Sequence, residues 1–257
     1  MSDIVNYENK GAVALITLNR PDAMNAFTTE LSKDLQLALE QAATDDIVRV
    51  VVLTGEGRCF SAGADLKSGF EGRPVFGKLH YEYRPVLSAI ATMAKPVIAA
   101  VPGSAAGIGM SMALHCDLVI MADNAFLLSP FTTISLVPDG GLSWLLVRQL
   151  GYRRAYQLSV ESERIPADRC VELGLANKTV QADELRGAAL AWAEQLAKCA
   201  PRSLEATKKT MRHAIDNDWA STFNLEADWQ QALAGSEDNI EGVAAFFEKR
   251  EPEFKGK

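Results

Sequence analysis

The stretch that decides the fold is residues 95–122, which read KPVIAAVPGSAAGIGMSMALHCDLVIMA. Its first part, Pro96–Val101, is an apolar run that predicts a buried strand. The glycine-rich turn that follows opens into Gly107–His115, a short buried helix, and Asp117–Met121 predicts another strand. A succession of strand, helix and strand indicates an α/β protein in which helices pack on the faces of a sheet.

A membrane span is the alternative for this stretch. No charged side chain stands between Lys95 and Asp117, and the interval is about as long as a membrane crossing. Pro102 and three glycines interrupt it, which favours the strand, turn and helix. The N-terminus, MSDIVNYENK, also lacks the basic start and apolar run of a signal peptide. We therefore expect no membrane partner.

Composition narrows the function further. The 257 residues are 48% hydrophobic, enough for a large core, and the net charge of −7 gives no basic stripe for nucleic acid. The four cysteines are widely spaced, without a C-x-x-C pair, which predicts reduced and mostly buried thiols in a cytoplasmic protein. No histidine has a partner at metal-ligand spacing, so we expect no metal site.

The same patterns extend to both sides of the central stretch. Val13–Asn19 and Val48–Thr54 predict strands, and leucines that recur every three or four residues after Thr29 predict a helix between them, which Thr28 or Thr29 can cap. Glycines and aromatics over Ser68–Pro85 predict an irregular loop, either a wall over a site or a plain connection. Beyond Val180 the composition favours helices, over the residues 183–199, 201–216, 217–233 and 241–250.

Two glycine-rich turns, Phe60–Leu66 (FSAGADL) and Pro102–Gly109 (PGSAAGIG), each follow a predicted strand. Small residues let a ligand approach the backbone, and two such turns can together offer two N–H donors to one developing oxyanion. Each turn alone is usually tight packing. The glycine order G-x-x-x-G-x-G also differs from the dinucleotide fingerprint G-x-G-x-x-G.

Together with HCDLVIMAD at 115–123, NRPDAMNAF at 19–27 and ELGLA at 172–176, the two turns resemble the crotonase (enoyl-CoA hydratase/isomerase) superfamily. The resemblance extends over nearly the whole chain, to AFFEKREPEF at 245–254. It implies a spiral core of repeated ββα turns over residues 1–195. It also implies a C-terminal helical subdomain over residues 196–257 that assembles homotrimers or dimers of trimers.

The resemblance also implies a substrate and its contacts. An acyl-CoA thioester would place its carbonyl between the backbone N–H groups of Ala64 and Ile108. Coenzyme A is then part of the substrate, and no separate cofactor is expected. Contacts to the CoA moiety are expected from two segments of the core and from the tail, which could reach the CoA of its own or of a neighbouring subunit. These residues are Met24, Ala26, Ala62, Asp65, Leu66, Phe246 and Lys249. The alternatives are that Asp65 only stabilises its turn and that the tail is a solvated helical face.

The reaction depends on the acids around the acyl group. Hydratases of the family carry two glutamates, and the matching positions here hold Ser111 and Phe131. Asp139 stands where isomerases of the family have their carboxylate, which favours a shift of the double bond from 3-enoyl to 2-enoyl. Apolar neighbours should raise the pKa of Asp139 and exclude water. We expect Ser111, Phe131, Leu136 and Trp144 to line the acyl pocket, although Trp144 and Phe131 could simply fill the core.

Alternatives to this prediction remain. From spacing alone, Asp139 after a proline and before GGLSWLL could be a helix N-cap, a role that would lower its pKa. Ser111, Asp139 and His213 occur in the chain order of a serine hydrolase. A protein that binds acyl-CoA without turnover would keep the turns and lose the acids. Within the enzyme class, an atypical hydratase, a specialised lyase or a ring-epoxide isomerase is also open.

Overall fold

The computed structural model describes residues 3–67 and 74–257. Its main sheet has the order β1-β2-β3-β5-β7-β10. The antiparallel pair β1–β2 begins this sheet and every other pairing is parallel. The strands are β1 (Val5–Lys10), β2 (Val13–Leu18), β3 (Val50–Gly55), β5 (Val97–Val101), β7 (Leu118–Ala122) and β10 (Lys178–Val180).

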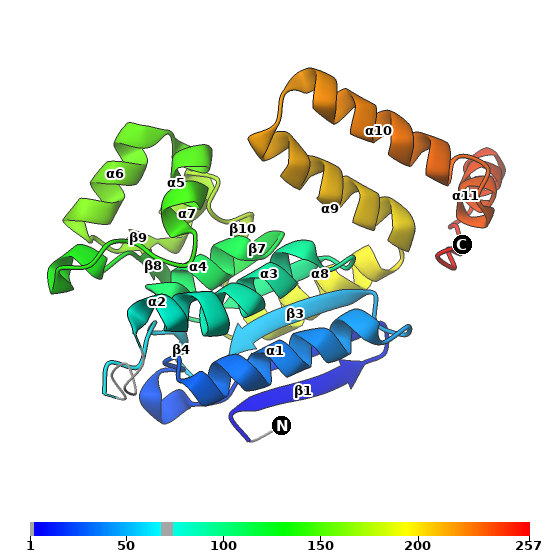
Figure 1. The fold of residues 1–257 in the computed structure, drawn as a ribbon. Helices are drawn as coiled ribbons and strands as arrows, with labels where there is room; N and C mark the ends of the chain where they lie inside the picture. Colours follow the sequence, from blue (N-terminus) through cyan, green and yellow to red (C-terminus); the bar gives the residue numbers. More distant parts are fainter. Residues whose placement is uncertain (1–2, 68–73) are drawn as a thin grey trace.

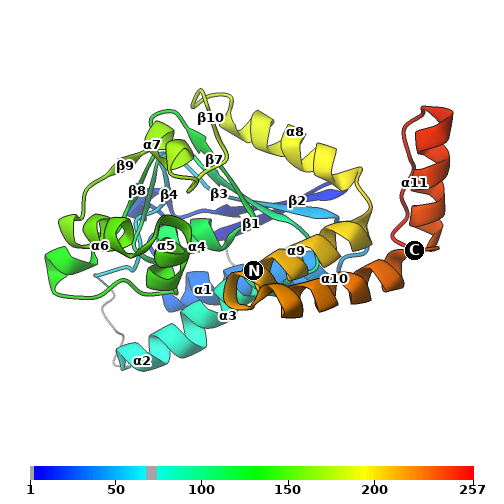
Figure 2. The same cartoon turned by 90° about the horizontal axis from the view of Figure 1, so that it is seen from above.

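Helices cover both faces of this sheet (Figure 2). On one face lies α8 (Leu185–Ala197), which contacts β2, β3, β5 and β7. The other face carries α1 (Thr29–Thr44), α3 (Arg84–Thr92) and α4 (Ile108–His115). Because both faces are covered, the strands β2, β3 and β5 are buried along their whole length.

A smaller sheet, in the order β4-β6-β8-β9, lies beside the main one. Its strands are β4 (Cys59–Ser61), β6 (Ser104–Ala106), β8 (Phe126–Leu128) and β9 (Ile165–Pro166). The pairs β4–β6 and β6–β8 are parallel. The strands β4, β6 and β8 each follow a strand of the main sheet, so the chain passes three times from the main sheet to the smaller one and then into a helix. The last strand, β9, follows α6.

The remaining elements are helical. Those near the small sheet are the 3-10 turns η1 (Pro21–Ala23) and η3 (Phe131–Ile134) and the helices α5 (Leu142–Leu150), α6 (Tyr152–Glu161) and α7 (Ala167–Glu172). After α8, the chain forms α9 (Pro201–Asp216), α10 (Trp219–Leu233) and α11 (Glu237–Glu248). The helices α10 and α11 extend away from the sheets (Figure 1).

A partly buried ionic cluster holds α9 on the core. Lys208 Nζ lies 2.7 Å from Asp117 Oδ2, and Arg212 Nη2 lies 2.8 Å from Asp117 Oδ1. Lys208 also donates to the Ile90 carbonyl at 2.9 Å. The side chains of Lys208, Asp117 and Arg212 are 7%, 18% and 27% exposed, so these charges satisfy one another largely shielded from water. The predicted subdomain boundary at residue 195 falls inside the last turn of α8 and stays a prediction.

The predicted strands and helices are confirmed to within a few residues at most ends, including the Thr28 cap of α1, whose side chain accepts from Leu31 N. Cys59, Cys116 and Cys170 are buried and Cys199 is exposed, as the prediction of mostly buried thiols requires. Among the described residues, no helix has the length and apolar character to cross a membrane.

The predicted loop over Ser68–Pro85 is wrong in its second half, while residues 68–73 lie outside the described residues. The chain is helical from α2 (Val75–Lys78) through the π-helical turn η2 (Leu79–Tyr83) into α3. Pro85 occupies the first turn of α3, where a missing backbone N–H costs little.

Candidate active site

The two glycine-rich turns lie side by side because their strands do. β4 and β6 are adjacent and parallel, with Cys59 paired to Ser104 and Ser61 to Ala105. The turns 62–66 and 107–109 therefore leave the same edge of the small sheet, at the carboxyl ends of its strands. That edge is where α/β proteins commonly bind ligands.

Glycine is required where the turns touch. Gly63 has φ +99°, and a Cβ there would meet the Ala106 carbonyl oxygen at 2.9 Å. Gly107 has φ +56° and sits before the first residue of α4, and its Cβ would lie 3.7 Å from Gly63 Cα. A side chain at either position would be strained by the positive φ, and at Gly63 it would also press on the Ala106 carbonyl of the second turn.

The two expected oxyanion donors sit on these turns. Within the described residues, neither Ala64 nor Ile108 uses its N–H in a hydrogen bond to another backbone carbonyl. Ile108 is the first residue of α4, so its N–H lacks a partner inside the helix and carries the positive end of the helix dipole. Both residues line one cavity. A carbonyl oxygen in that cavity could therefore accept from both.

The first turn is held by Asn25, which the sequence reasoning missed. Asn25 is fully buried with φ +54°. Its Nδ2 donates to the Cys59 carbonyl at 2.7 Å, and its own carbonyl accepts from Ser61 Oγ at 2.9 Å. The signal that could have revealed this role is an asparagine shortly after the NRP sequence, because asparagine tolerates the left-handed conformation that a tight turn requires.

The cavity holds about 190 Å³ and is enclosed by four segments. Two are the glycine-rich turns. The third is the helix that includes Val75, Leu79 and Tyr83, and the fourth is the segment from Pro130 to Asp139. Its lining is predominantly apolar. Asp65 and Asp139 are the acidic side chains among its described lining residues.

Asp139 lies at the end of the fourth segment. Its Oδ1 is buried and has no hydrogen-bond partner among the described residues. Burial raises the pKa of Asp139 from its ordinary 3.8 to about 6. A carboxylate with a raised pKa and an unused oxygen in a cavity is a candidate general base.

The N-cap alternative for Asp139 is wrong. The capping residue of α5 is Gly141, and no side chain caps that helix. The Asp139 backbone carbonyl accepts from Leu142 N at 3.1 Å, which leaves its carboxylate out of the cap. The helix therefore does not lower the pKa of Asp139 in the way that a capping bond would.

Ser111 holds the backbone of Asp139. It is fully buried on α4, and its Oγ donates to the Asp139 carbonyl at 2.9 Å. Ser111 does not line the cavity, whereas Phe131 and Leu136 do. The adjacent Gly140 has φ +59°, and a Cβ there would meet Ile108 Cδ1 at 2.6 Å, so the Asp139 loop is pressed against the second turn.

Trp144 was expected in the acyl pocket, and the structure places it elsewhere. Its indole Nε1 donates to Asp216 Oδ1 at 3.2 Å, and Arg148 Nη2 donates to the same oxygen at 3.1 Å. Trp144 is 38% exposed and links α5 to the end of α9. The helical phase of α5, one turn beyond the Asp139 loop, directs it away from the cavity.

Of the expected CoA contacts of the core, Ala62, Asp65 and Leu66 line the cavity, whereas Met24 and Ala26 do not. Ala62 N donates to the Met24 carbonyl at 2.9 Å, so the segment containing Met24 and Ala26 runs beside the first turn. Leu66 is 70% exposed. Asp65 accepts from Arg20 Nη2 at 3.1 Å and from the Lys67 N–H, which supports its turn-stabilising role.

Phe246 and Lys249 lie far from the cavity of Asp139. They belong to the end of α11, which Figures 1 and 2 place at the opposite end of the molecule from α2 and β4. Within this chain the tail does not reach the cavity. Their expected contact to CoA would therefore need a second subunit.

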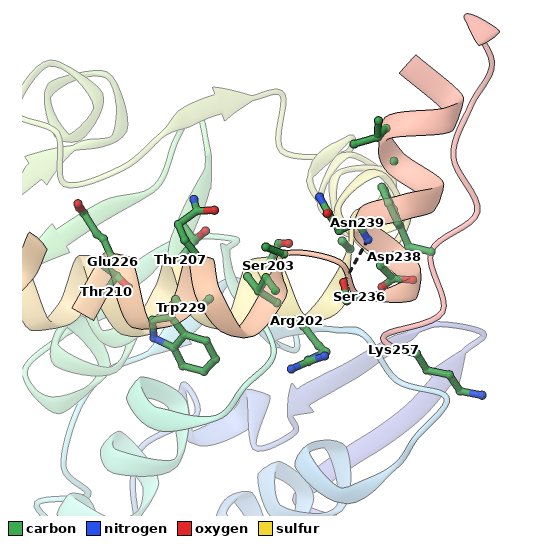
Figure 3. A pocket seen from close by; sticks show the side chains of 18 of the residues that line it. Arg202, Ser203, Thr207, Thr210, Glu226, Trp229, Ser236, Asp238, Asn239 and Lys257 are labelled. Carbon is green, nitrogen blue, oxygen red and sulfur yellow. Dashed lines mark hydrogen bonds between the residues drawn. The ribbon is translucent and has the colours of Figure 1, made fainter. Parts of the chain in front are cut away.

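A larger groove, of about 970 Å³, lies among α9, α10 and α11 (Figure 3). Phe223, Phe246 and Phe247 line it and are more than half exposed. Its lining shares no residue with the cavity of Asp139. The larger volume of this groove does not identify it as the active site, because the groove is an uncovered apolar face.

The serine hydrolase alternative finds no support. Ser111 Oγ donates to backbone carbonyls, and His213 Nε2 shares a hydrogen bond with Ser221 Oγ at 2.9 Å. His115 hydrogen-bonds the Ser111 carbonyl through Nδ1 at 2.8 Å, as a satisfied core histidine would. In residues 3–67 and 74–257, no group of His, Cys, Asp and Glu is arranged to hold a metal ion.

Comparison with known proteins agrees with this geometry. Residues 8–257 match the enoyl-CoA hydratase/isomerase family. The chain is 39% identical to a probable enoyl-CoA hydratase of Rhodobacter capsulatus over 98% of each chain. It is 36% identical to the 1,2-epoxyphenylacetyl-CoA isomerase of Escherichia coli over the full length of both. An enoyl-CoA hydratase structure from Bacillus anthracis superposes with a TM-score of 0.94 at 32% identity, covering 99% of this chain and 100% of the other.

Proposed function

The chain belongs to the enoyl-CoA hydratase/isomerase family, and on that premise we propose that it is an isomerase that moves a double bond within an acyl-CoA. Asp139 serves as the single acid and base. The observation that carries the proposal is the unpartnered, buried carboxylate oxygen of Asp139 in the cavity that Ala64 and Ile108 also line.

The proposed reaction begins with the thioester. Its carbonyl oxygen accepts from the N–H groups of Ala64 and Ile108, which stabilise negative charge on that oxygen. The Asp139 carboxylate removes a proton from C2, and the C–H electron pair enters the conjugated dienolate. The same proton returns to C4, the double bond moves from C3–C4 to C2–C3, and Asp139 is again a carboxylate. The proposed reaction neither consumes nor releases water.

The acidic side chains that line the cavity support isomerisation over hydration. A hydratase needs groups that hold and activate a water molecule. Among the described lining residues the other acid is Asp65, which is paired with Arg20. Phe131 is 7% exposed and presents an apolar ring to the cavity. A single desolvated carboxylate suits transfer of one proton between two carbons.

The test is turnover of a 3-enoyl-CoA and a 2-enoyl-CoA by the purified protein and by Asp139→Asn. We expect the wild type to convert the 3-enoyl-CoA to its 2-enoyl isomer, with a loss of at least about a hundredfold in Asp139→Asn, the scale of general acid–base catalysis. Hydration of the 2-enoyl-CoA at a comparable rate would favour an atypical hydratase. Binding without turnover would favour an acyl-CoA-binding protein.

We also propose that the groove among α9, α10 and α11 is covered by a second copy of the chain, in a homotrimer or a dimer of trimers. Two of its lining residues, Phe246 and Phe247, are 76% and 77% exposed, which is unfavourable for a lone chain in water. Such an arrangement would let Phe246 and Lys249 of one copy approach the CoA of another. Sedimentation equilibrium of the wild type tests it: a monomer at micromolar concentration would contradict the assembly.

A further inference from the structure

Tyr83 is a further polar residue of the Asp139 cavity, and the isomerase chemistry does not use it. It ends the π-helical turn η2 and is 3% exposed. Its hydroxyl is buried and has no hydrogen-bond partner among the described residues. A buried hydroxyl without a partner is costly, and such groups in native structures need an explanation.

The position of Tyr83 relates it to the substrate. Tyr83 and Asp139 line the same cavity, together with the oxyanion donors Ala64 and Ile108. The phenol and the Asp139 carboxylate also interact electrostatically: burial first, and then the charge of Asp139, raise the pKa of Tyr83. The hydroxyl therefore keeps its proton at neutral pH and is available as a donor.

The ring of Tyr83 is fixed from two sides. Phe27 meets it edge-on, with ring centroids 6.0 Å apart and planes at 85°. Lys78 Nζ lies 5.9 Å from the ring centroid, and Lys78 itself is 4% exposed. Because the ring has little freedom, the position of the hydroxyl oxygen is set before a ligand binds, and only the O–H bond needs to rotate toward an acceptor. Such a π turn in a helix often marks a functional position.

From these observations we infer that Tyr83 donates a hydrogen bond to an oxygen carried by the acyl group itself, beyond the thioester. The substrate class is an acyl-CoA whose short acyl part bears an acceptor oxygen near the carbons between which Asp139 moves the proton. This inference rests on the proposed function for the placement of the acyl group. A purely hydrocarbon chain would leave the Tyr83 hydroxyl unsatisfied in the complex, and a site of that kind discriminates against such a chain.

Affinity, measured without turnover, tests the inference. Pentanoyl-CoA and 4-oxopentanoyl-CoA differ by one acceptor oxygen on C4, and neither carries a double bond to isomerise. Calorimetric titration of the wild type should give an affinity about tenfold higher for 4-oxopentanoyl-CoA, the scale of one hydrogen bond to a buried donor. Succinyl-CoA, with a carboxylate at the same carbon, shows whether the preferred oxygen is neutral or charged.

The variant Tyr83→Phe keeps the ring and removes the hydroxyl. It should bring the two affinities within about twofold of each other and leave that for pentanoyl-CoA nearly unchanged. The matched control is Tyr81→Phe, on the same helix, where the side chain is 77% exposed and does not line the cavity. It should keep the wild-type ratio.

Equal wild-type affinities for all three ligands, or a preference that persists in Tyr83→Phe, would overturn the inference. Either result would leave the isomerase proposal standing, because that depends on turnover and on Asp139. Conversely, a protein without isomerase turnover could still show the preference that depends on Tyr83.

Discussion

The burial of Asp139 predicts that removing its charge stabilises the fold at high pH. In the native protein the pKa of Asp139 is about 6, against an ordinary value of 3.8. Between these values the native state binds more protons than the unfolded state. Stability therefore falls as the pH rises through this window, and above about pH 6 the full cost of the buried carboxylate remains.

The size of this cost follows from the shift. A shift of about two units corresponds to roughly 3 kcal/mol at 1.36 kcal/mol per unit. Asparagine removes the charge but leaves a polar amide in the same apolar surroundings. We therefore expect Asp139→Asn to raise the free energy of unfolding by about 1–3 kcal/mol at pH 8 and to leave it nearly unchanged at pH 4.

Urea unfolding of wild type and Asp139→Asn measures the difference, at pH 4, 6 and 8 and at one protein concentration, so that any assembly contributes equally. Asp65→Asn is the matched control. It removes a carboxylate paired with Arg20, so the free energy of unfolding should fall by up to about 1 kcal/mol or stay the same. An Asp139→Asn protein that is less stable than wild type at pH 8, or equally affected at pH 4, would refute the reasoning.

Three further predictions follow from the site. The kcat/KM for isomerisation should rise with pH through about 6, as Asp139 loses its proton, and stay level above; a profile flat from pH 5 to 8 would exclude Asp139 as the base. Gly107→Ala should cost at least about 1 kcal/mol of stability and most of the turnover, because φ there is +56°; urea unfolding and turnover that both match wild type would contradict this. Trp144→Phe should keep kcat/KM within about twofold of the wild-type value, because Trp144 lies outside the cavity. A large rise in KM would instead show that Trp144 contacts the acyl group.

The sequence predicted the fold largely because its strands are buried on both faces and its helices are periodic. Val50–Gly55 and Val97–Val101 form apolar runs that only a covered sheet can accommodate. The short strands of the second sheet, such as Cys59–Ser61, carry too few residues to show a pattern of their own. Their pairing, which brings the two turns together, depends on contacts between distant parts of the chain.

The site was predicted unevenly for similar reasons. Asp139 and the two turns follow from motifs, because glycines and a lone acid are visible in the sequence. The burial of Tyr83 was missed because the glycines and aromatics of Ser68–Pro85 suggested a loop, where the chain forms a π turn and a helix. Trp144 was expected in the pocket or in the core, but helical phase decides where a side chain points, and Trp144 donates to Asp216 instead.

The most direct test of the account is the fate of the C2 proton. With a 3-enoyl-CoA deuterated at C2, the wild type should transfer deuterium to C4 of the 2-enoyl product, at least in part, because one carboxylate removes and returns it. Asp139→Asn should form almost no product, while its CoA ligands still bind. Rapid isomerisation by Asp139→Asn would contradict the central role of this carboxylate.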